Sequence, residues 1–176
     1  MAEWNALFCK IMTLLTNLKE KKKLFFKRQN FFYFLIIFTI FFLDRYSKIT
    51  VLNYFDEKSY YINDFINFDL IWNTGIGFGL MSFDSTLIYN LITFLVCSVI
   101  IILLIVALSF KTIDKLFFTL IIGGALGNFY DRLIFKAVPD FIDLHYNSFH
   151  WFTFNVADIF ITIGIIGYLF NGTLRT

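Results

Sequence analysis

Apolar residues gather in four long runs along the chain, and polar residues fill the stretches between them. The runs span about 31–52, 86–108, 116–134 and 153–171. Each run is long enough to cross a hydrocarbon core of about 30 Å, because a helix rises about 1.5 Å per residue. The pattern therefore predicts four transmembrane helices.

The stretch at about 53–85, between the first two runs, has a different pattern. Apolar and polar residues alternate there in places, and Tyr, Phe, Ile and Trp are frequent. Such a pattern is typical of strands. The expected fold is an all-α membrane protein with four transmembrane helices and a small β-rich subdomain between the first and second helices. A shorter segment, 135–152, joins the last two runs, and its Asp143 is expected to be a solvated loop acid.

Composition supports a membrane protein. Of the 176 residues, 59% are hydrophobic, and 26 are Phe. Soluble domains are about half apolar, so a soluble fold of this size could not bury so many apolar side chains. A soluble domain with one anchor is excluded as well, because the apolar runs cover most of the chain.

The distribution of Lys and Arg predicts the orientation, since cytoplasmic flanks carry the excess of positive charge. Ten such residues flank the runs on one side: Lys10, Lys19, Lys21, Lys22, Lys23, Lys27, Arg28, Lys111, Lys115 and Arg175. Four belong to the other side: Arg45, Lys48, Lys58 and Lys136. Both termini are therefore expected in the cytoplasm, and the segments 53–85 and 135–152 on the outer, periplasmic face.

Residues 1–30 form a basic extension before the first run. It lacks the small-residue cleavage site of a secretory signal peptide, and its early apolar residues recur at helical spacing. Two interpretations remain open. The extension is either an amphipathic helix on the inner membrane surface or a dispensable segment with Met12 as a second start. The remainder, 31–176, is expected to be one four-helix transmembrane domain.

Polar side chains occur where the runs meet the outer face, although ionisable groups inside a span cost roughly 2.5–3.5 kcal/mol each. They are Asp44, Lys48, Asn128, Asp131, Arg132, Asn155 and Asp158. Taken singly, each fits an anchor at the membrane interface. Asp44 and Lys48 are four residues apart and can pair, and a local ion pair would explain Asp131 and Arg132. Their convergence at one depth, however, favours a functional site.

Helical spacing explains how these groups converge. Gly124, Asn128 and Arg132 step by four and share one helix face. The pair Gly123–Gly124 lets a neighbouring helix approach closely. Asn155 and Asp158 are three residues apart, so they share a face of the fourth helix.

Asp140 and Asp158 are eighteen residues apart, across the turn back into the membrane. If they face each other, two like charges in a poorly hydrated site raise one pKa, and the pair shares a proton as in aspartic proteases. The ionised member can then activate water, and the protonated member can polarise a carbonyl.

Other chemistry has little support in the sequence. Cys9 and Cys97 are too few for a disulfide framework. His145 and His150 are five residues apart with no Cys nearby, so no metal site is expected. Nothing points to a cofactor or to nucleic acid, and nothing demands more than a monomer.

Four sequence blocks together resemble the lipoprotein signal peptidase family, also called signal peptidase II, which are aspartic proteases of bacterial membranes. The blocks are DRYSK, NTGIGFG, GGALGNFYDR followed by VPDF, and FNVAD, and the resemblance runs from about residue 31 to 171. One departure is Gly77, where the family usually has Ala.

The resemblance implies catalytic aspartates at Asp140 and Asp158. It implies supporting polar residues at Asp44, Lys48, Asn73, Gly124, Asn128, Asp131, Arg132 and Asn155. Among these, Asn128 and Arg132 are expected to hold substrate or lipid carbonyl oxygens, Asp131 to orient Arg132, Asn155 to steady Asp158, and Asn73 to contact the peptide.

The implied activity is removal of the signal peptide from diacylglyceryl-modified prolipoproteins, with the cut just before the lipidated cysteine and with globomycin as inhibitor. The implied location is the bacterial inner membrane, with the active site near the periplasmic face. Two other interpretations stay open: a four-helix carrier or channel subunit whose acids bind protons or cations, and a structural assembly factor.

Overall fold

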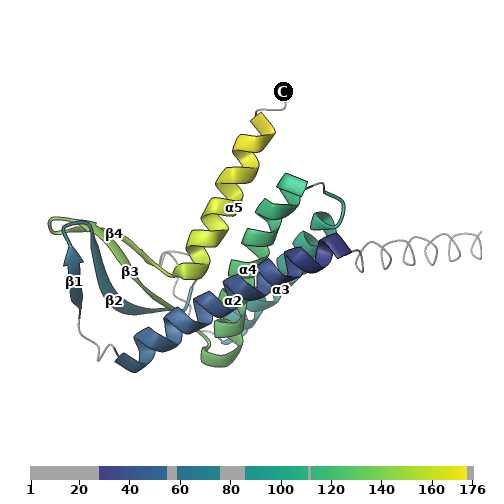
Figure 1. Cartoon of the computed structure of the whole chain (residues 1–176). Helices are drawn as coiled ribbons and strands as arrows, with labels where there is room; N and C mark the ends of the chain where they lie inside the picture. Colours follow the sequence, from purple (N-terminus) through teal and green to yellow (C-terminus); the bar gives the residue numbers. More distant parts are fainter. Residues whose placement is uncertain (1–27, 55–58, 76–85, 111, 174–176) are drawn as a thin grey trace, which may run out of the picture.

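The computed structural model describes residues 28–54, 59–75, 86–110 and 112–173, which form helices packed beside a small sheet (Figure 1). The helices are α2 (Arg28–Tyr54), α3 (Thr86–Ala107), α4 (Thr112–Phe135) and α5 (Val156–Thr173). The strands are β1 (Tyr60–Asn63), β2 (Ile66–Asn73), β3 (Val138–Tyr146) and β4 (Phe149–Phe154). Most of the predicted basic extension, residues 1–27, lies outside the described residues.

Each of the four predicted runs contains a helix in the structure, with changes at the ends. One change concerns the last helix, which the sequence predicts to begin at about residue 153. Thr153 and Phe154 instead end β4, and Asn155 separates that strand from α5. Two of the described helices are long and apolar enough to cross a membrane, at Tyr89–Ala107 within α3 and at Val156–Thr173. Helices α2 and α4 differ from these two in carrying several charged residues, among them Lys48 and Asp131.

The sheet is antiparallel, with the strand order β1-β2-β3-β4. Strands β1 and β2 lie within the segment predicted to be β-rich. The prediction was incomplete, however, because β3 and β4 come from the connection between α4 and α5. Strand β2 pairs with β3, so two segments far apart in the sequence build one sheet.

Asp143 corrects another expectation. It is not a solvated loop acid, since it lies within β3 and is only 4% exposed. The pairing of β3 with strands on both sides is the physical reason: Asp143 has Asn67 as its partner on β2 and Thr153 on β4.

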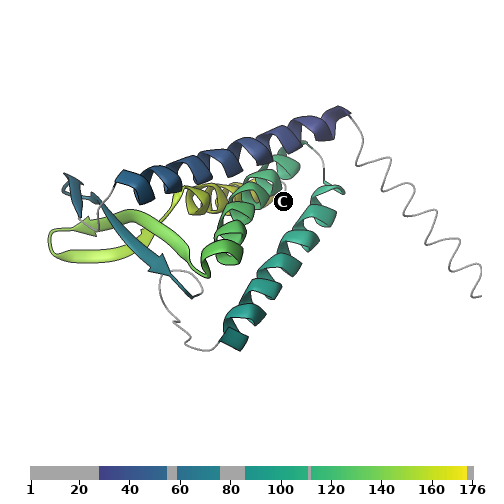
Figure 2. The same ribbon diagram turned by 90° about the horizontal axis from the view of Figure 1, so that it is seen from below.

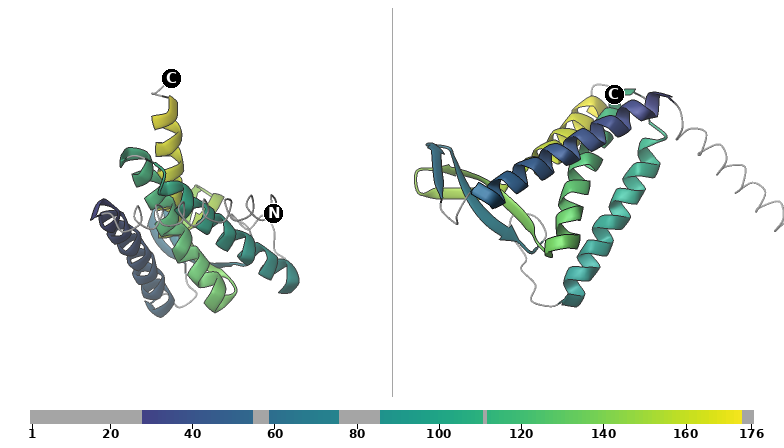
Figure 3. Two further views of the ribbon diagram at one scale, coloured as in Figure 1. Left: turned by 90° about the vertical axis from the view of Figure 1, so that its right-hand side faces the viewer. Right: turned by 60° about the horizontal axis from the view of Figure 1, so that its bottom comes forward.

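Helix α4 is central and packs against α2, α3 and α5. Figure 3 shows it between α2 and α3. The sheet lies beyond the ends of α2 and α4 and beside the start of α5 (Figure 2). This arrangement brings the polar ends of three helices to the edge of the sheet.

Two glycines allow α4 to approach its neighbours closely, as the sequence predicted. A Cβ atom on Gly123 would lie 2.9 Å from Ile40 Cβ on α2. A Cβ atom on Gly124 would lie 2.4 Å from the carbonyl oxygen of Ala157 on α5. Larger residues would therefore force both helices away from α4.

Candidate active site

A buried lysine joins α2 to α4. The Lys48 ammonium donates hydrogen bonds to Asp44 Oδ2 at 2.8 Å, Asp131 Oδ2 at 2.7 Å and Asn128 Oδ1 at 2.9 Å. Lys48 and both aspartates are 0% exposed. An ammonium group has three N–H donors, and all three are used, so the predicted pair of Asp44 and Lys48 is part of a larger network.

Asp131 does not orient Arg132, contrary to expectation. Its second carboxylate oxygen instead pairs with Arg45 of α2, whose guanidinium lies 4.8 Å from the centre of the Tyr130 ring. In the sequence, Arg45 contributes only to the charge distribution that predicts the membrane orientation. No spacing within one helix could reveal the pairing, since its partner lies on another helix.

The network extends to the start of α5. Asp44 Oδ1 accepts a hydrogen bond from the backbone N–H of Ala157 at 2.9 Å. The first N–H groups of a helix have no partner within the helix, and Asp44 satisfies one of them. Asp44 therefore links α2 directly to α5, and through Lys48 it is connected to α4.

Asn155 and Asp158 cap the start of α5 reciprocally. Asn155 Oδ1 accepts from the Asp158 backbone N–H, and Asp158 Oδ2 accepts from the Asn155 backbone N–H, both at 3.1 Å. This is the arrangement of a capping box. Asp158 Oδ1 accepts a further hydrogen bond from Asn128 Nδ2 at 2.8 Å. Both carboxylate oxygens of Asp158 are thus fixed.

Asp140 lies on β3 and is held by two amides. Its Oδ1 accepts from Asn155 Nδ2 at 2.6 Å, and its Oδ2 accepts from Asn73 Nδ2 at 2.9 Å. Burial raises the pKa of Asp140 to about 6; the hydrogen bond from Asn73 opposes this rise, and the nearby charge of Asp158 adds to it. Asn155 contacts both aspartates and therefore sets their relative position.

A cavity of about 310 Å³ lies between the sheet and the helices. Its lining consists of Asn73, Asn128, Arg132, Asp140, Thr153, Asp158, Ile161, Thr162 and Ile165. Arg132 spans one wall by donating to the backbone oxygens of Asn128 at 3.3 Å and Gly75 at 3.2 Å. The cavity is polar where the two aspartates meet it and apolar along α5.

The structure brings the sequence-predicted residues together in two layers. Asp140, Asp158, Asn73, Asn128 and Arg132 line the cavity, and Asn155 lies beside both aspartates. Asp44, Lys48 and Asp131 form the ion network behind them, while Gly124 only permits close helix packing. Arg45, Gly75 and Thr153 also belong to the site, and nothing in the local sequence indicates this because only the fold brings them there.

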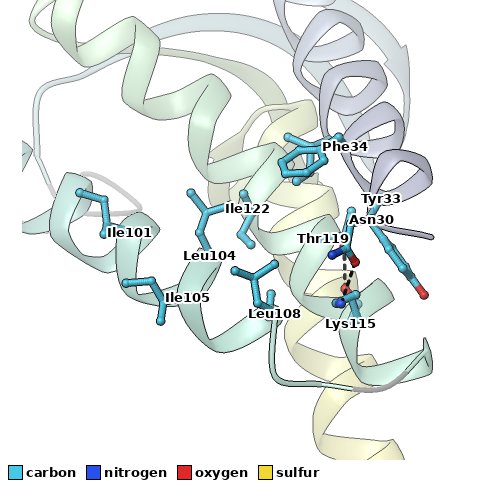
Figure 4. A pocket seen from close by; sticks show the side chains of 12 residues that line it. Asn30, Tyr33, Phe34, Ile101, Leu104, Ile105, Leu108, Lys115, Thr119 and Ile122 are labelled. Atoms are coloured by element: carbon cyan, nitrogen blue, oxygen red, sulfur yellow. Dashed lines mark hydrogen bonds between the residues drawn. The ribbon is translucent and has the colours of Figure 1, made fainter. Parts of the chain in front are cut away.

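A second cavity lies at the other end of the helices, between α2, α3 and α4 (Figure 4). It measures about 320 Å³ and is lined mainly by Ile, Leu and Phe. Lys115 lies at its edge and donates to Asn30 Oδ1 at 2.9 Å. No carboxylate is among the residues that line it, which distinguishes it from the first cavity.

Some of the helices are able to cross a membrane, and a cavity lined by two carboxylates lies at one end of them. These features define the class as a helical membrane protein with a polar site at one end. The chain belongs to the signal peptidase II family, because the family model described as signal peptidase (SPase) II matches residues 36–174. The resemblance seen in the four sequence blocks is confirmed. The chain is therefore a membrane protease of lipoprotein processing.

Individual relatives agree with this assignment. A lipoprotein signal peptidase of Pelagibacter ubique (strain HTCC1062) is 52% identical over 133 residues, covering 74% of this chain and 80% of the relative. One of Anaplasma phagocytophilum (strain HZ) is 38% identical over 139 residues, covering 77% and 87%. A solved structure of a bacterial membrane enzyme superposes with a TM-score of 0.66 at 26% identity, covering 81% of this chain and 87% of that one.

Proposed function

We propose that this chain is an aspartic endopeptidase that removes the signal peptide from diacylglyceryl-modified prolipoproteins, cutting just before the lipidated cysteine. Asp140 and Asp158 form its catalytic pair. One observation carries the proposal: both carboxylates line the same cavity of about 310 Å³, and hydrogen bonds hold each of them in place.

The environments of the two aspartates assign their roles. Burial, together with the charge of Asp158, raises the pKa of Asp140 to about 6, so this carboxyl takes up a proton readily. Asp158, the other member of the pair, removes a proton from a water molecule held between the two groups. Asp140 donates to the scissile carbonyl oxygen as the water attacks it, and a proton then passes to the leaving amine. Neither a metal ion nor a nucleophilic side chain takes part.

The asparagines serve mainly to hold the aspartates. Asn73, Asn128 and Asn155 each direct a side-chain amide at a catalytic carboxylate. This revises the roles expected for Asn73 and Asn128, whose amides are engaged within the protein. Arg132 remains the cationic group on the cavity wall and is the candidate for holding a substrate carbonyl oxygen.

The cavity wall also suits a lipid-bearing substrate. Ile161 and Ile165 present apolar surface along α5, one turn and two turns inward from the aspartates. We place all four helices across the bacterial inner membrane, with both termini in the cytoplasm and the sheet on the periplasmic side. The protein acts as a monomer, and globomycin is expected to inhibit it. A carrier is disfavoured because the polar groups gather at one end of the helices rather than at mid-depth.

The decisive experiment incubates the purified protein with a diacylglyceryl-modified prolipoprotein and identifies the products by mass spectrometry. Asp140→Asn and Asp158→Asn should each lower turnover by about 10²–10⁴-fold, the usual range for loss of an acid–base group. Asp64→Asn is the matched control, because it makes the same change on an exposed turn of the same sheet. Near-normal turnover by Asp158→Asn would refute the catalytic pair.

A further inference from the structure

Three ionisable side chains meet on the sheet outside the candidate active site. Asp143 and His145 are two residues apart on β3, so they point to the same face. His150 on β4 is the direct cross-strand partner of His145. The sequence spacing predicted no metal site, but strand pairing places the two histidines side by side.

The distances among these groups suit a metal ion. Asp143 Oδ2 lies 2.7 Å from His150 Nδ1 and 3.6 Å from His145 Nδ1. Each of the three residues offers one possible ligand atom, a carboxylate oxygen or a ring nitrogen, that lies within 4.8 Å of the other two. Ligands bound at about 2.0–2.1 Å to a tetrahedral zinc ion are about 3.3 Å apart. The two measured separations fall on either side of this value, so small side-chain movements would complete the site.

A second observation also points to a ligand. Among the residues that the structure describes, two buried side-chain atoms lack a hydrogen-bond partner, and they are His145 Nδ1 and Asn67 Oδ1. His145 is 5% exposed, and Asn67 lies opposite Asp143 on β2. Both atoms thus belong to the same region of one sheet face. A buried polar atom left unpaired costs about 1–3 kcal/mol.

The backbone holds His145 in place while His150 leaves the site open. The His145 backbone N–H donates to the Phe65 carbonyl oxygen at 2.9 Å, so the position of its ring does not depend on a ligand. The side chain of His150 is 56% exposed, which gives an ion a path from solvent. A structural hydrogen bond between Asp143 and His150 would explain that pair alone, and it would leave His145 Nδ1 unsatisfied.

We propose that Asp143 Oδ2, His145 Nδ1 and His150 Nδ1 bind one Zn²⁺ ion, with water in the fourth position. Neutral imidazole nitrogens and a carboxylate oxygen are ordinary zinc ligands. Asn67 Oδ1 offers an acceptor on the same face for the bound water. The ion joins β3 to β4 and satisfies the buried His145 nitrogen. This proposal does not depend on the catalytic role of Asp140 and Asp158.

Binding also displaces a proton. A carboxylate oxygen only accepts hydrogen bonds, so the proton between His150 Nδ1 and Asp143 Oδ2 belongs to the imidazole. Zinc takes its place on Nδ1 of the neutral ring, and the proton moves to the vacant Nε2.

The test uses the full chain without a histidine tag, purified in detergent, stripped with a chelator and titrated with ZnCl₂ alone. Cys9 and Cys97 are replaced by Ser so that thiols cannot compete. Calorimetry should show one Zn²⁺ per chain. His145→Ala and His150→Ala should each weaken binding by at least about tenfold, as loss of a ligand requires. Asp69→Asn, an acid on β2 of the same sheet, is the matched control and should bind zinc as the parent does.

Histidine NMR gives an independent readout, because the chain has two histidines. With ¹⁵N-labelled histidine, both imidazole signals should shift when ZnCl₂ is added to the parent protein. Should His145→Ala fail to fold, His150→Ala still decides the matter, since that ring is largely exposed. The absence of zinc binding would overturn the proposal. Equal binding by the parent and His150→Ala would also overturn it and would indicate adventitious surface binding.

Discussion

Lys48 shows how a single residue organises this protein. Its ammonium is fully buried, and each of its three donors meets an acceptor on α2 or α4. Burying a charge is tolerated only when it is paired and hydrogen-bonded. Lys48 thus pairs with both Asp44 and Asp131 and holds Asn128, which in turn holds Asp158.

Removal of this cation should be severely destabilising. Lys48→Met leaves two buried carboxylates without their shared partner, and breaking such pairs costs about 3–5 kcal/mol. The midpoint of thermal unfolding in detergent should fall by roughly 6–20 °C. Lys136→Met makes the same change at an exposed residue and should leave the midpoint almost unchanged. Equal midpoints for the two variants would contradict the role of Lys48.

Asp140 makes stability depend on pH. Its pKa is raised from 3.8 to about 6 by burial, so the folded state binds the proton more tightly than the unfolded state. The resulting stabilisation is complete below about pH 4 and is lost as the pH rises through about 6; the shift corresponds to about 3 kcal/mol at most. Between pH 7.5 and pH 5, the unfolding midpoint of the parent should rise relative to that of Asp140→Asn. Parallel pH curves for the two proteins would argue against the raised pKa.

At the scale of the elements, the helices were predictable and half of the sheet was not. Long apolar runs predict helices because a membrane span needs about 20 predominantly apolar residues. The sequence of strands β3 and β4 follows directly on α4. Their strand character depends on β2, which supplies the hydrogen bonds along one edge of β3.

The contact between α4 and α5 positions the site and can be tested at Gly124. A Cβ atom there would lie 2.4 Å from the Ala157 carbonyl oxygen and 2.9 Å from Ile161 Cγ1. Gly124→Ala should therefore push α5 outward, costing about 1–3 kcal/mol of stability. It should also lower protease activity, because Asp158 follows Ala157 directly. Both effects are measured by thermal unfolding and by the prolipoprotein cleavage assay.

Gly172→Ala provides the control for this change, because a Cβ atom at Gly172 would meet nothing within 4 Å. Replacing a helical glycine by alanine otherwise favours the helix by about 1 kcal/mol. This control should retain full activity and equal or higher stability. If Gly124→Ala behaved in the same way, α4 and α5 would not be packed as described.

At the scale of the whole molecule, the candidate site depends on a sheet placed at the end of a helix bundle. Asn73 comes from β2, Asp140 from β3, Asn128 from α4 and Asp158 from α5. No single element contains the site. The proposed orientation puts the sheet and the cavity on the periplasmic side, where a prolipoprotein would reach them.

Cysteine labelling in intact cells tests this orientation. Ser148→Cys lies in the turn between β3 and β4, and Ser109→Cys lies beyond the end of α3; both serines are exposed. In a chain with Cys9 and Cys97 replaced by Ser, a membrane-impermeant maleimide should label Ser148→Cys only, as detected by a mass shift. Both variants should react after the cells are lysed. Labelling of Ser109→Cys alone in intact cells would reverse the topology.

The sequence by itself determined the helices, the family and most of the polar residues of the site. Apolar runs follow directly from the cost of exposing polar groups to lipid, and spacing by three or four fixes which side chains share a helix face. The tertiary structure decided which of these groups touch. It paired Asp131 with Arg45, turned the amides of Asn73 and Asn155 toward Asp140, and placed His145 beside His150. Such contacts depend on strand register and helix packing, which join residues that local sequence spacing leaves unrelated.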